Sequence, residues 1–206
     1  TATPPLAWQR AFNRGTLPGV TIPARYHGHP LPEPQLAVVR QLRRRIHNCR
    51  PIPAMERFFE RVRREAGQAY VFVPGLSDIV PVTHWIAQYV ADWCVTGVSS
   101  RDRKRSQKVA HFREKMYDCL VTTTILERGV TVQNAHVLII QADHPVFDEA
   151  ALVQMSGRCG RSATFPSGHV SWMASQMTRE QRRALTHIQN MNREAMRHGW
   201  LHDVLK

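Results

Sequence analysis

Short apolar runs alternate with amphipathic segments from about residue 69 to the end of the chain. The runs are continuous rather than alternating, which is typical of strands buried on both faces of a sheet. Strands are predicted at "AYVFVP" (69–74), "WCVTGV" (93–98), "CLVTTT" (119–124), "AHVLIIQA" (135–142) and "HVSWMAS" (169–175). Because helical segments separate them, the pattern predicts an α/β fold with a parallel sheet flanked by helices.

Helices are predicted between and after these strands, at 77–90, 101–115 and 178–198, with Val109 and Phe112 of the second one facing the core. The proline-rich start of the chain gives a weaker pattern. There we expect a helix at 6–14, a strand around 19–27, and helices at 36–49 and 55–65 that lead into the sheet.

A further helix is predicted over the segment that contains "QMSGRCGR" (154–161). Its apolar face would carry Leu152, Met155 and Cys159. Its opposite face would carry Gln154, Arg158 and Arg161. Gly157 and Gly160 lie between the faces, where a missing side chain lets another backbone or a ligand approach. Because forked guanidinium donors match phosphate oxygens, the spacing favours an anion-binding helix; solvated arginines on an ordinary amphipathic helix are the alternative.

Composition adds a strong charge bias. The 206 residues carry a net charge of +12, and their hydrophobic fraction of 43% suffices for a globular core. The charge recurs in "RQLRRR" (40–45), "ERVRR" (60–64) and "RDRKR" (101–105). Each run alone is typical of a solvated helix face, but the three together favour nucleic acid over other polyanions such as a membrane surface.

Cysteine and histidine usage indicates no metal site. The four cysteines form no C-x-x-C pair, so we expect free thiols in a reducing compartment rather than a zinc site or a disulfide framework. His27 and His29 have metal-ligand spacing, but further ligands are missing nearby in the sequence. No signal peptide and no apolar run of about 18 residues is present, so we expect no transmembrane segment.

In parallel sheets, ligands bind beyond the carboxyl ends of the strands. The residues at those predicted ends are Pro74, Gly75, Ser99, Ser100, Arg101, Thr122, Thr123 and Thr124. These residues are small, hydroxylated or cationic, which suits contacts to phosphates.

Several motifs together resemble the C-terminal half of superfamily 2 helicases. "QMSGRCGR" resembles the sixth helicase motif, "VTTTILERGVTV" (121–132) the fifth, "VFVPG" (71–75) the fourth and "TATP" (1–4) the third. Within the superfamily, "IPARYHGHPLP", "TTTILERGVTV" and "ADHPVFDEAALVQMSGRCGRS" are most similar to the ComFA type, the ATPases of DNA uptake in bacterial competence. The resemblance covers nearly the whole chain and implies a RecA-like domain.

The resemblance also implies roles for individual residues. Arg158 and Arg161 would be arginine fingers that reach the γ-phosphate of ATP, with Gln154 lining the site. Gly129 would lie near the nucleotide, whereas Thr131 stands where many relatives have an aspartate, which leaves a ribose contact unsupported. The DNA backbone would be held by Pro74, Gly75, Ser100, Arg101, Thr122 and Thr123.

The chain contains no G-x-x-x-x-G-K-[ST] loop, so it lacks the nucleotide cradle of such motors. We therefore expect residues 1–34 to be the remnant of a first RecA-like domain with its crossover, and 35–206 to be the second. The full-length parent would be a DNA-dependent ATPase that uses ATP and Mg²⁺, while this piece alone would be inactive. A primosome-type restart helicase and a non-catalytic nucleic-acid-binding module are the alternatives. The expected partners are single-stranded DNA and the competence protein ComFC. The expected location is the cytoplasm, either free or peripherally attached to the inner face of the membrane.

Overall fold

The computed structural model describes residues 6–19, 22–124 and 132–202. Within them the strands form one six-stranded sheet, every neighbouring pair of which is parallel, in the order β1-β6-β5-β2-β4-β3. The strands are β1 (Gln35–Val38), β2 (Gln68–Phe72), β3 (Val95–Val98), β4 (Cys119–Thr122), β5 (Ala135–Ile140) and β6 (Val170–Ala174). The predicted α/β architecture is confirmed, as is each strand predicted from residue 69 onward.

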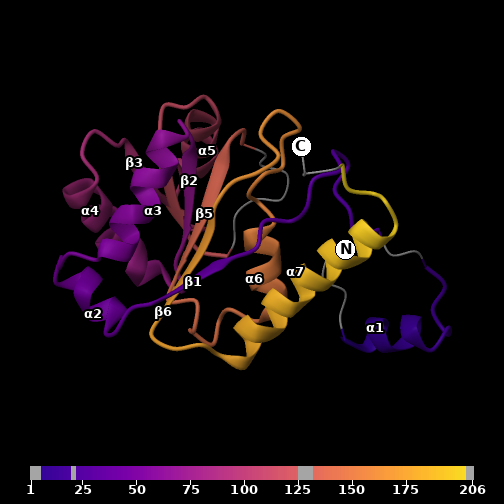
Figure 1. The fold of residues 1–206 in the computed structure, drawn as a ribbon. Coiled ribbons are helices and arrows are strands. Elements are labelled where there is room, and N and C mark those ends of the chain that lie inside the picture. The colour runs from indigo at the N-terminus through magenta and orange to yellow at the C-terminus, as the bar shows by residue number, and fades with distance from the viewer. Residues whose placement is uncertain (1–5, 20–21, 125–131, 203–206) are drawn as a thin grey trace.

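The helices also follow local sequence signals. They are α1 (Leu6–Asn13), α2 (Leu42–His47), α3 (Pro53–Arg64), α4 (Leu76–Tyr89), α5 (Arg105–Arg113), α6 (Glu149–Ser156) and α7 (Arg179–Arg197). A capping box of Thr178 and Gln181 starts α7, and the Asp148 carboxylate accepts the Ala151 N–H at the start of α6. In Figure 1, α1 lies apart from the sheet, whereas the other helices pack around it.

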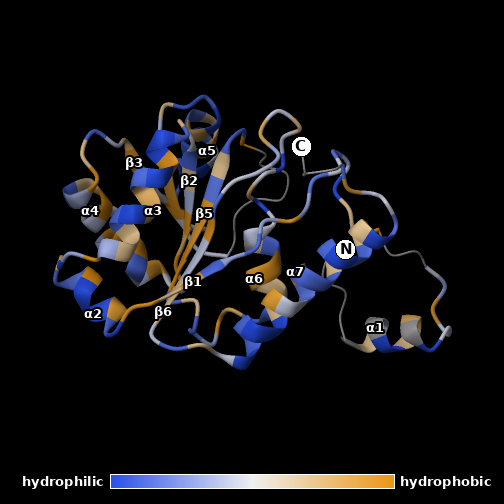
Figure 2. Ribbon diagram, viewed as in Figure 1, coloured by the Kyte–Doolittle hydropathy of each residue, from blue (hydrophilic) through white to orange (hydrophobic). Residues whose placement is uncertain are grey.

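Two apolar layers enclose the sheet. One face is covered by α5, α6 and α7, and Tyr70 of β2 points into this layer beside Phe112. The other face is covered by α2, α3 and α4, and Val71 of β2 belongs to that layer together with Phe59 and Trp85. Figure 2 shows the apolar residues gathered on the strands and on the inner sides of the helices. The burial of Val109 and Phe112 confirms the predicted core side of α5.

Two expectations for the start of the chain are wrong. Residues 35–38 form a strand, whereas the pattern predicted a helix from residue 36; the helix begins only at Leu42. Residues 22–27 contain no strand. The physical reason is that β1 is a short, partly exposed edge strand paired only with β6 among the described strands, so its sequence lacks the continuous apolar run of the inner strands.

The parallel sheet has two different ends. At the carboxyl end, β2, β4 and β3 lie side by side, and the Val73 N–H donates to the Thr122 carbonyl oxygen at 2.9 Å. Helix α6 follows β5 and runs back along the sheet, so the segment after it lies at the amino end. There the Cys159 Sγ is 3.8 Å from the carbonyl oxygen of His169, which directly precedes β6. In the part of the chain that the structure describes, no helix combines the length and apolar character needed to cross a membrane.

Candidate functional site

Residues 157–161, here called the arginine turn, follow the last residue of α6. Helix α6 ends at Ser156, and Gly157 is its C-cap. Arg158 and Arg161 therefore lie beyond the helix, and the prediction that they share a helical face with Gln154 is wrong. The reason lies in the two glycines, since glycine is costly in a helix interior and favours its end. Gly160 has a φ of +63°, a left-handed conformation that glycine adopts without strain.

Three consecutive residues near the start of the chain hold the arginine turn. The Arg25 guanidinium donates to the carbonyl oxygens of Gly160 and, at 3.3 Å, of Gly157. The His27 Nε2 lies 3.0 Å from the Gly160 oxygen, and the Tyr26 hydroxyl donates to the Arg161 oxygen at 3.1 Å. We call residues 25–27 the clasp. Sequence reasoning missed it, because the contacts join positions more than 130 residues apart and leave no spacing signal.

The closeness of these contacts explains the glycine at position 160. A Cβ atom there would collide with the backbone carbonyl of Pro166 and would crowd the Arg25 guanidinium. The backbone on one side and the clasp on the other thus occupy the space that a side chain needs. The expectation that a glycine permits close approach by another backbone is confirmed at Gly160.

The turn gathers positive charge in a partly buried place. Burial lowers the pKa of Arg25 to about 10, and the neighbouring Arg161 lowers it further, against the effect of Cys159. Burial also lowers the pKa of Arg158, with Tyr70 opposing and Arg161 adding to the shift. The pKa of the Tyr70 phenol rises to about 12 through burial, although nearby arginines oppose this. Because Arg161 disfavours the charged forms of both Arg25 and Arg158, an anion placed among the three would be stabilised.

The remaining predicted residues of this region are placed as follows. The proposed packing residues Leu152, Met155 and Cys159 are buried, which confirms their core-facing role. Gln154 is exposed in the last turn of α6. Gly129 and Thr131 lie outside the described residues, as do residues 1–4, so their predicted roles stay predictions.

The predicted DNA contacts lie together at the other end of the sheet. Pro74 and Gly75 follow β2, Thr123 follows β4, and Ser100 and Arg101 follow β3, all on adjacent strands. Ser100 and Arg101 are exposed, and Pro74 and Gly75 are half-buried. The loop after β3 is ordered by Asp102, whose carboxylate accepts from the Lys108 Nζ at 2.7 Å. Thr122 and Thr123 are only 2% and 7% exposed, so they offer little surface to a ligand.

A second cluster at the amino end has residue types that bind transition metals. Ligand atoms of Glu65, His136 and His169 lie within 4.8 Å of one another. However, the His136 Nδ1 accepts the His169 backbone N–H at 3.1 Å, so the neutral ring carries its proton on Nε2, the atom that faces Glu65. The His169 Nε2 bonds to Glu65, and the Arg61 guanidinium is 3.5 Å from its Nδ1. The hydrogen bonds thus engage the Nδ1 of His136 and the Nε2 of His169, and the His136 nitrogen that faces Glu65 carries a proton, which does not suit a metal ligand.

Comparison with known proteins shows which family the chain belongs to. Residues 53–163 match the family described as "Helicase conserved C-terminal domain". The chain is 36% identical over 93% of its length to Competence protein ComFA of Bacillus subtilis, and 29% identical over 95% to that of Streptococcus pneumoniae. It spans 41% and 45% of those two relatives. In the solved structure of RecG bound to a three-way DNA junction, a similar fold covers 76% of this chain and 20% of RecG, with a TM-score of 0.54 and 21% identity.

The family match covers more than half of the chain and includes β2 to β5, α6 and the whole arginine turn. The six-stranded parallel sheet with helices on both faces is the RecA-like architecture. The chain belongs to the helicase conserved C-terminal domain family and is a ComFA-type member of it.

Proposed function

We propose that this chain is the second motor domain of an ATP-driven translocase that moves single-stranded DNA during uptake in natural competence. The relatives that match over nearly the whole chain are competence proteins, which supports that setting. In this proposal residues 1–34 are the end of a first RecA-like domain with its crossover, and residues 35–206 are the second domain. The competence protein ComFC stays a predicted partner, and a cytoplasmic location stays predicted too.

The observation that carries the proposal is the arginine turn with its clasp. Arg161 lies near both Arg158 and Arg25, and the Arg25 guanidinium is committed to the carbonyl oxygens of Gly157 and Gly160. The clasp thus fixes the backbone, while Arg158 and Arg161 supply the guanidinium groups for a phosphate. In phosphoryl transfer the γ-phosphate gathers negative charge on its equatorial oxygens, and an inserted arginine contributes about 10³ to 10⁵ in rate.

The main phosphate and metal sites belong elsewhere in this proposal. Mg²⁺, which neutralises phosphate oxygens when bound, takes carboxylate and phosphate oxygens as ligands. The arginine turn offers cations instead, so it fits a phosphate and does not fit Mg²⁺. We therefore assign the ion and the phosphate cradle to the first motor domain of the full-length parent, with Gln154 facing the nucleotide from this side.

The DNA path in this proposal runs over the carboxyl ends of β2, β4 and β3. Backbone amides, the Ser100 hydroxyl and the Arg101 guanidinium are suited to phosphate contacts without base readout. Because Thr122 and Thr123 are buried, Gly75, Ser100 and Arg101 make most of the phosphate contacts in this proposal. Since α6 runs back from the carboxyl end of the sheet, the DNA path and the arginine turn lie at opposite ends of the domain in this proposal.

The 206-residue chain itself tests the proposal. We expect no DNA-stimulated ATP hydrolysis, because the phosphate cradle is missing, and weak binding of oligothymidylate that falls steeply with salt. Steady-state ATPase assays and fluorescence anisotropy across a salt series measure both. Turnover by this chain alone would contradict the half-motor proposal, and an affinity independent of salt would contradict the backbone-contact path.

A further inference from the structure

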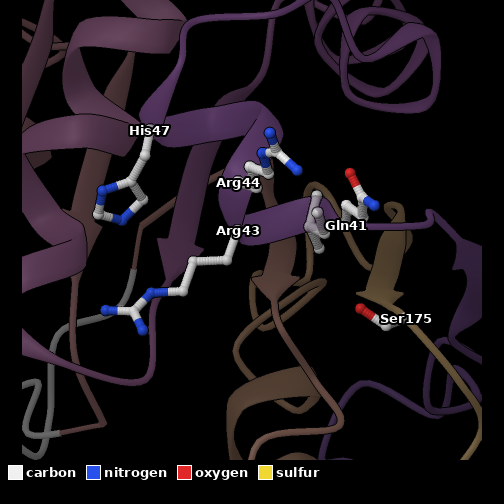
Figure 3. Close-up of a pocket in the computed structure, with 6 residues that line it drawn as sticks. Gln41, Arg43, Arg44, His47 and Ser175 are labelled. Carbon is white, nitrogen blue, oxygen red and sulfur yellow. The ribbon is translucent and has the colours of Figure 1, made fainter.

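A pocket of about 490 Å³ lies where the ends of β1 and β6 meet α2. It is lined by Gln41, Leu42, Arg43, Arg44, His47 and Ser175, five of which Figure 3 labels. Gln41 comes shortly after β1 and Ser175 directly follows β6, and these two strands are neighbours. The pocket therefore opens at the carboxyl end of the sheet, on the same end as the proposed DNA path but beyond the strands assigned to it.

The basic side chains of this pocket have different contacts. The Arg43 Nε and the His47 Nε2 lie 3.3 and 3.4 Å from the Asp78 Oδ1, and Asp78 is buried. Figure 3 shows Arg43 extending away from Gln41 and Ser175. Arg44 is exposed and makes no side-chain hydrogen bond or ion pair with any residue that the structure describes. Arg44 is thus the cation of this pocket whose donors are available to a ligand.

Asp78 connects the pocket to the proposed DNA path. It lies in the first turn of α4, directly after the Pro74–Gly75 turn, and its N–H donates to the Gly75 carbonyl oxygen at 3.1 Å. Arg43 and His47 bind its carboxylate from the pocket side. The half-buried turn after β2 and the pocket after β1 are therefore linked through the buried Asp78.

Positive charge surrounds this pocket. A second pocket, also about 490 Å³, shares Gln41 and is lined in addition by Arg40, Arg45 and Arg57. Neither pocket is lined by an acidic residue among those described. The nearby carboxylates are already engaged: Asp78 as above, and Asp143 by the Ser175 N–H at 3.0 Å. Such a field, with hydroxyl and amide donors beside an open guanidinium, suits a phosphate.

We propose that the pocket between α2 and the end of β6 binds a backbone phosphate of single-stranded DNA through Arg44, assisted by the Gln41 amide and the Ser175 hydroxyl. The inference rests on the proposed function and extends its DNA path from β3 across the sheet to β1. The contacts reach the sugar-phosphate backbone only, so the site is independent of sequence.

The test is Arg44→Gln in the 206-residue chain, with a long labelled oligothymidylate in fluorescence anisotropy across a salt series. We expect the affinity to fall roughly tenfold and the slope of log K against log salt to fall by about 0.7, the share of one phosphate contact. Arg44→Lys keeps the charge but loses the fork, so it should keep the slope and lose part of the affinity. The matched control is Arg197→Gln, an exposed arginine at the end of α7, which should change neither quantity.

Each contrary outcome has a distinct meaning. Equal losses in Arg44→Gln and Arg197→Gln would show a general charge effect and overturn the site. If the unmodified chain binds DNA with a steep salt slope and Arg44→Gln leaves it unchanged, this inference fails and the proposed function stands; no DNA binding by the unmodified chain contradicts both. Loss of binding to phosphatidylglycerol vesicles with retained DNA affinity would assign the pocket to a membrane surface instead. Thermal melting of Arg44→Gln should stay close to that of the unmodified chain, because the side chain is exposed.

Discussion

The guanidinium of Arg25 is bonded to the backbone of Gly157, with the Nη2 atom donating to the carbonyl oxygen at 3.3 Å across 132 residues of sequence. The same side chain also donates to the Gly160 carbonyl oxygen. One half-buried arginine therefore fixes the chain on both sides of Arg158. Arg25 is a positioning residue in this account, since it acts on the backbone that carries Arg158 and not on the phosphate itself.

Loss of Arg25 should consequently impair catalysis more than binding. We expect Arg25→Ala in the full-length parent to lower kcat of DNA-stimulated ATP hydrolysis about 10- to 100-fold, because small misplacements of a catalytic group are costly. Single-stranded DNA affinity should stay unchanged. Arg25→Lys should restore only part of kcat, since one ammonium lacks the fork that reaches both carbonyl oxygens. Arg14→Ala, which removes an exposed arginine of the same segment, is the control, and a normal kcat in Arg25→Ala would refute the positioning role.

A comparison of alanine substitutions at Gly160 and Gly199 separates the cost of a strained backbone from the cost of a steric clash. Both have a positive φ, +63° and +66°, but a Cβ atom at Gly160 meets the Pro166 carbonyl while one at Gly199 meets nothing within 4 Å. We expect Gly199→Ala to lower the free energy of unfolding by about 1 kcal/mol, from the left-handed backbone alone. Gly160→Ala should cost roughly 1–3 kcal/mol more. Urea denaturation of both variants decides this, and equal losses would mean that the turn is loosely packed.

The free energy of unfolding should decrease as the pH is lowered, because of His136. Burial lowers the pKa of its imidazole to about 4, with a smaller opposite effect from Glu65 and a further lowering by His169. Folding therefore favours the neutral ring, so this contribution is fully present above the unfolded pKa of about 6.5 and is lost as pH falls towards 4. The loss should reach up to about 3 kcal/mol.

His136→Asn tests this, because an amide oxygen can still accept the His169 N–H but does not titrate in this range. Urea denaturation between pH 7 and about pH 4 should show a shallower dependence on pH in the variant. Glu65 and His169 face the same ring and remain in both proteins, so the difference between the two curves reports His136. Parallel curves would contradict the assignment.

Much of the fold could be predicted because the inner strands are buried on both faces. β2, β4, β5 and β6 are entirely buried, so their sequences are largely apolar runs, which is typical of a covered parallel sheet. β1 escaped prediction because an edge strand with partial exposure needs no such run. Residues 35–38 form a strand because they pair with β6, and this tertiary contact is not encoded in the local sequence.

The geometry around the predicted arginines could not be read from the sequence, and their roles stay predictions. The "GRCGR" segment indicates an anion-binding element, but helical periodicity placed Arg158 and Arg161 on a helix that ends at Ser156. The clasp depends on contacts between residues 25–27 and the arginine turn, which lie far apart in the sequence, so no local pattern encodes them. His27, which has metal-ligand spacing to His29 in the sequence, instead bonds to the Gly160 carbonyl oxygen.

The most direct test of the account is the rate of DNA-stimulated ATP hydrolysis in the full-length parent with Arg158→Ala or Arg161→Ala. Turnover should fall by about two or more orders of magnitude, the lower range for an arginine finger. Single-stranded DNA affinity and the melting temperature, measured on the same proteins, should change little, because the DNA path lies at the other end of the sheet and Leu152, Met155 and Cys159 do the packing. A joint fall of affinity and turnover would assign the arginines to DNA, and near-normal turnover in both variants would contradict the finger assignment outright.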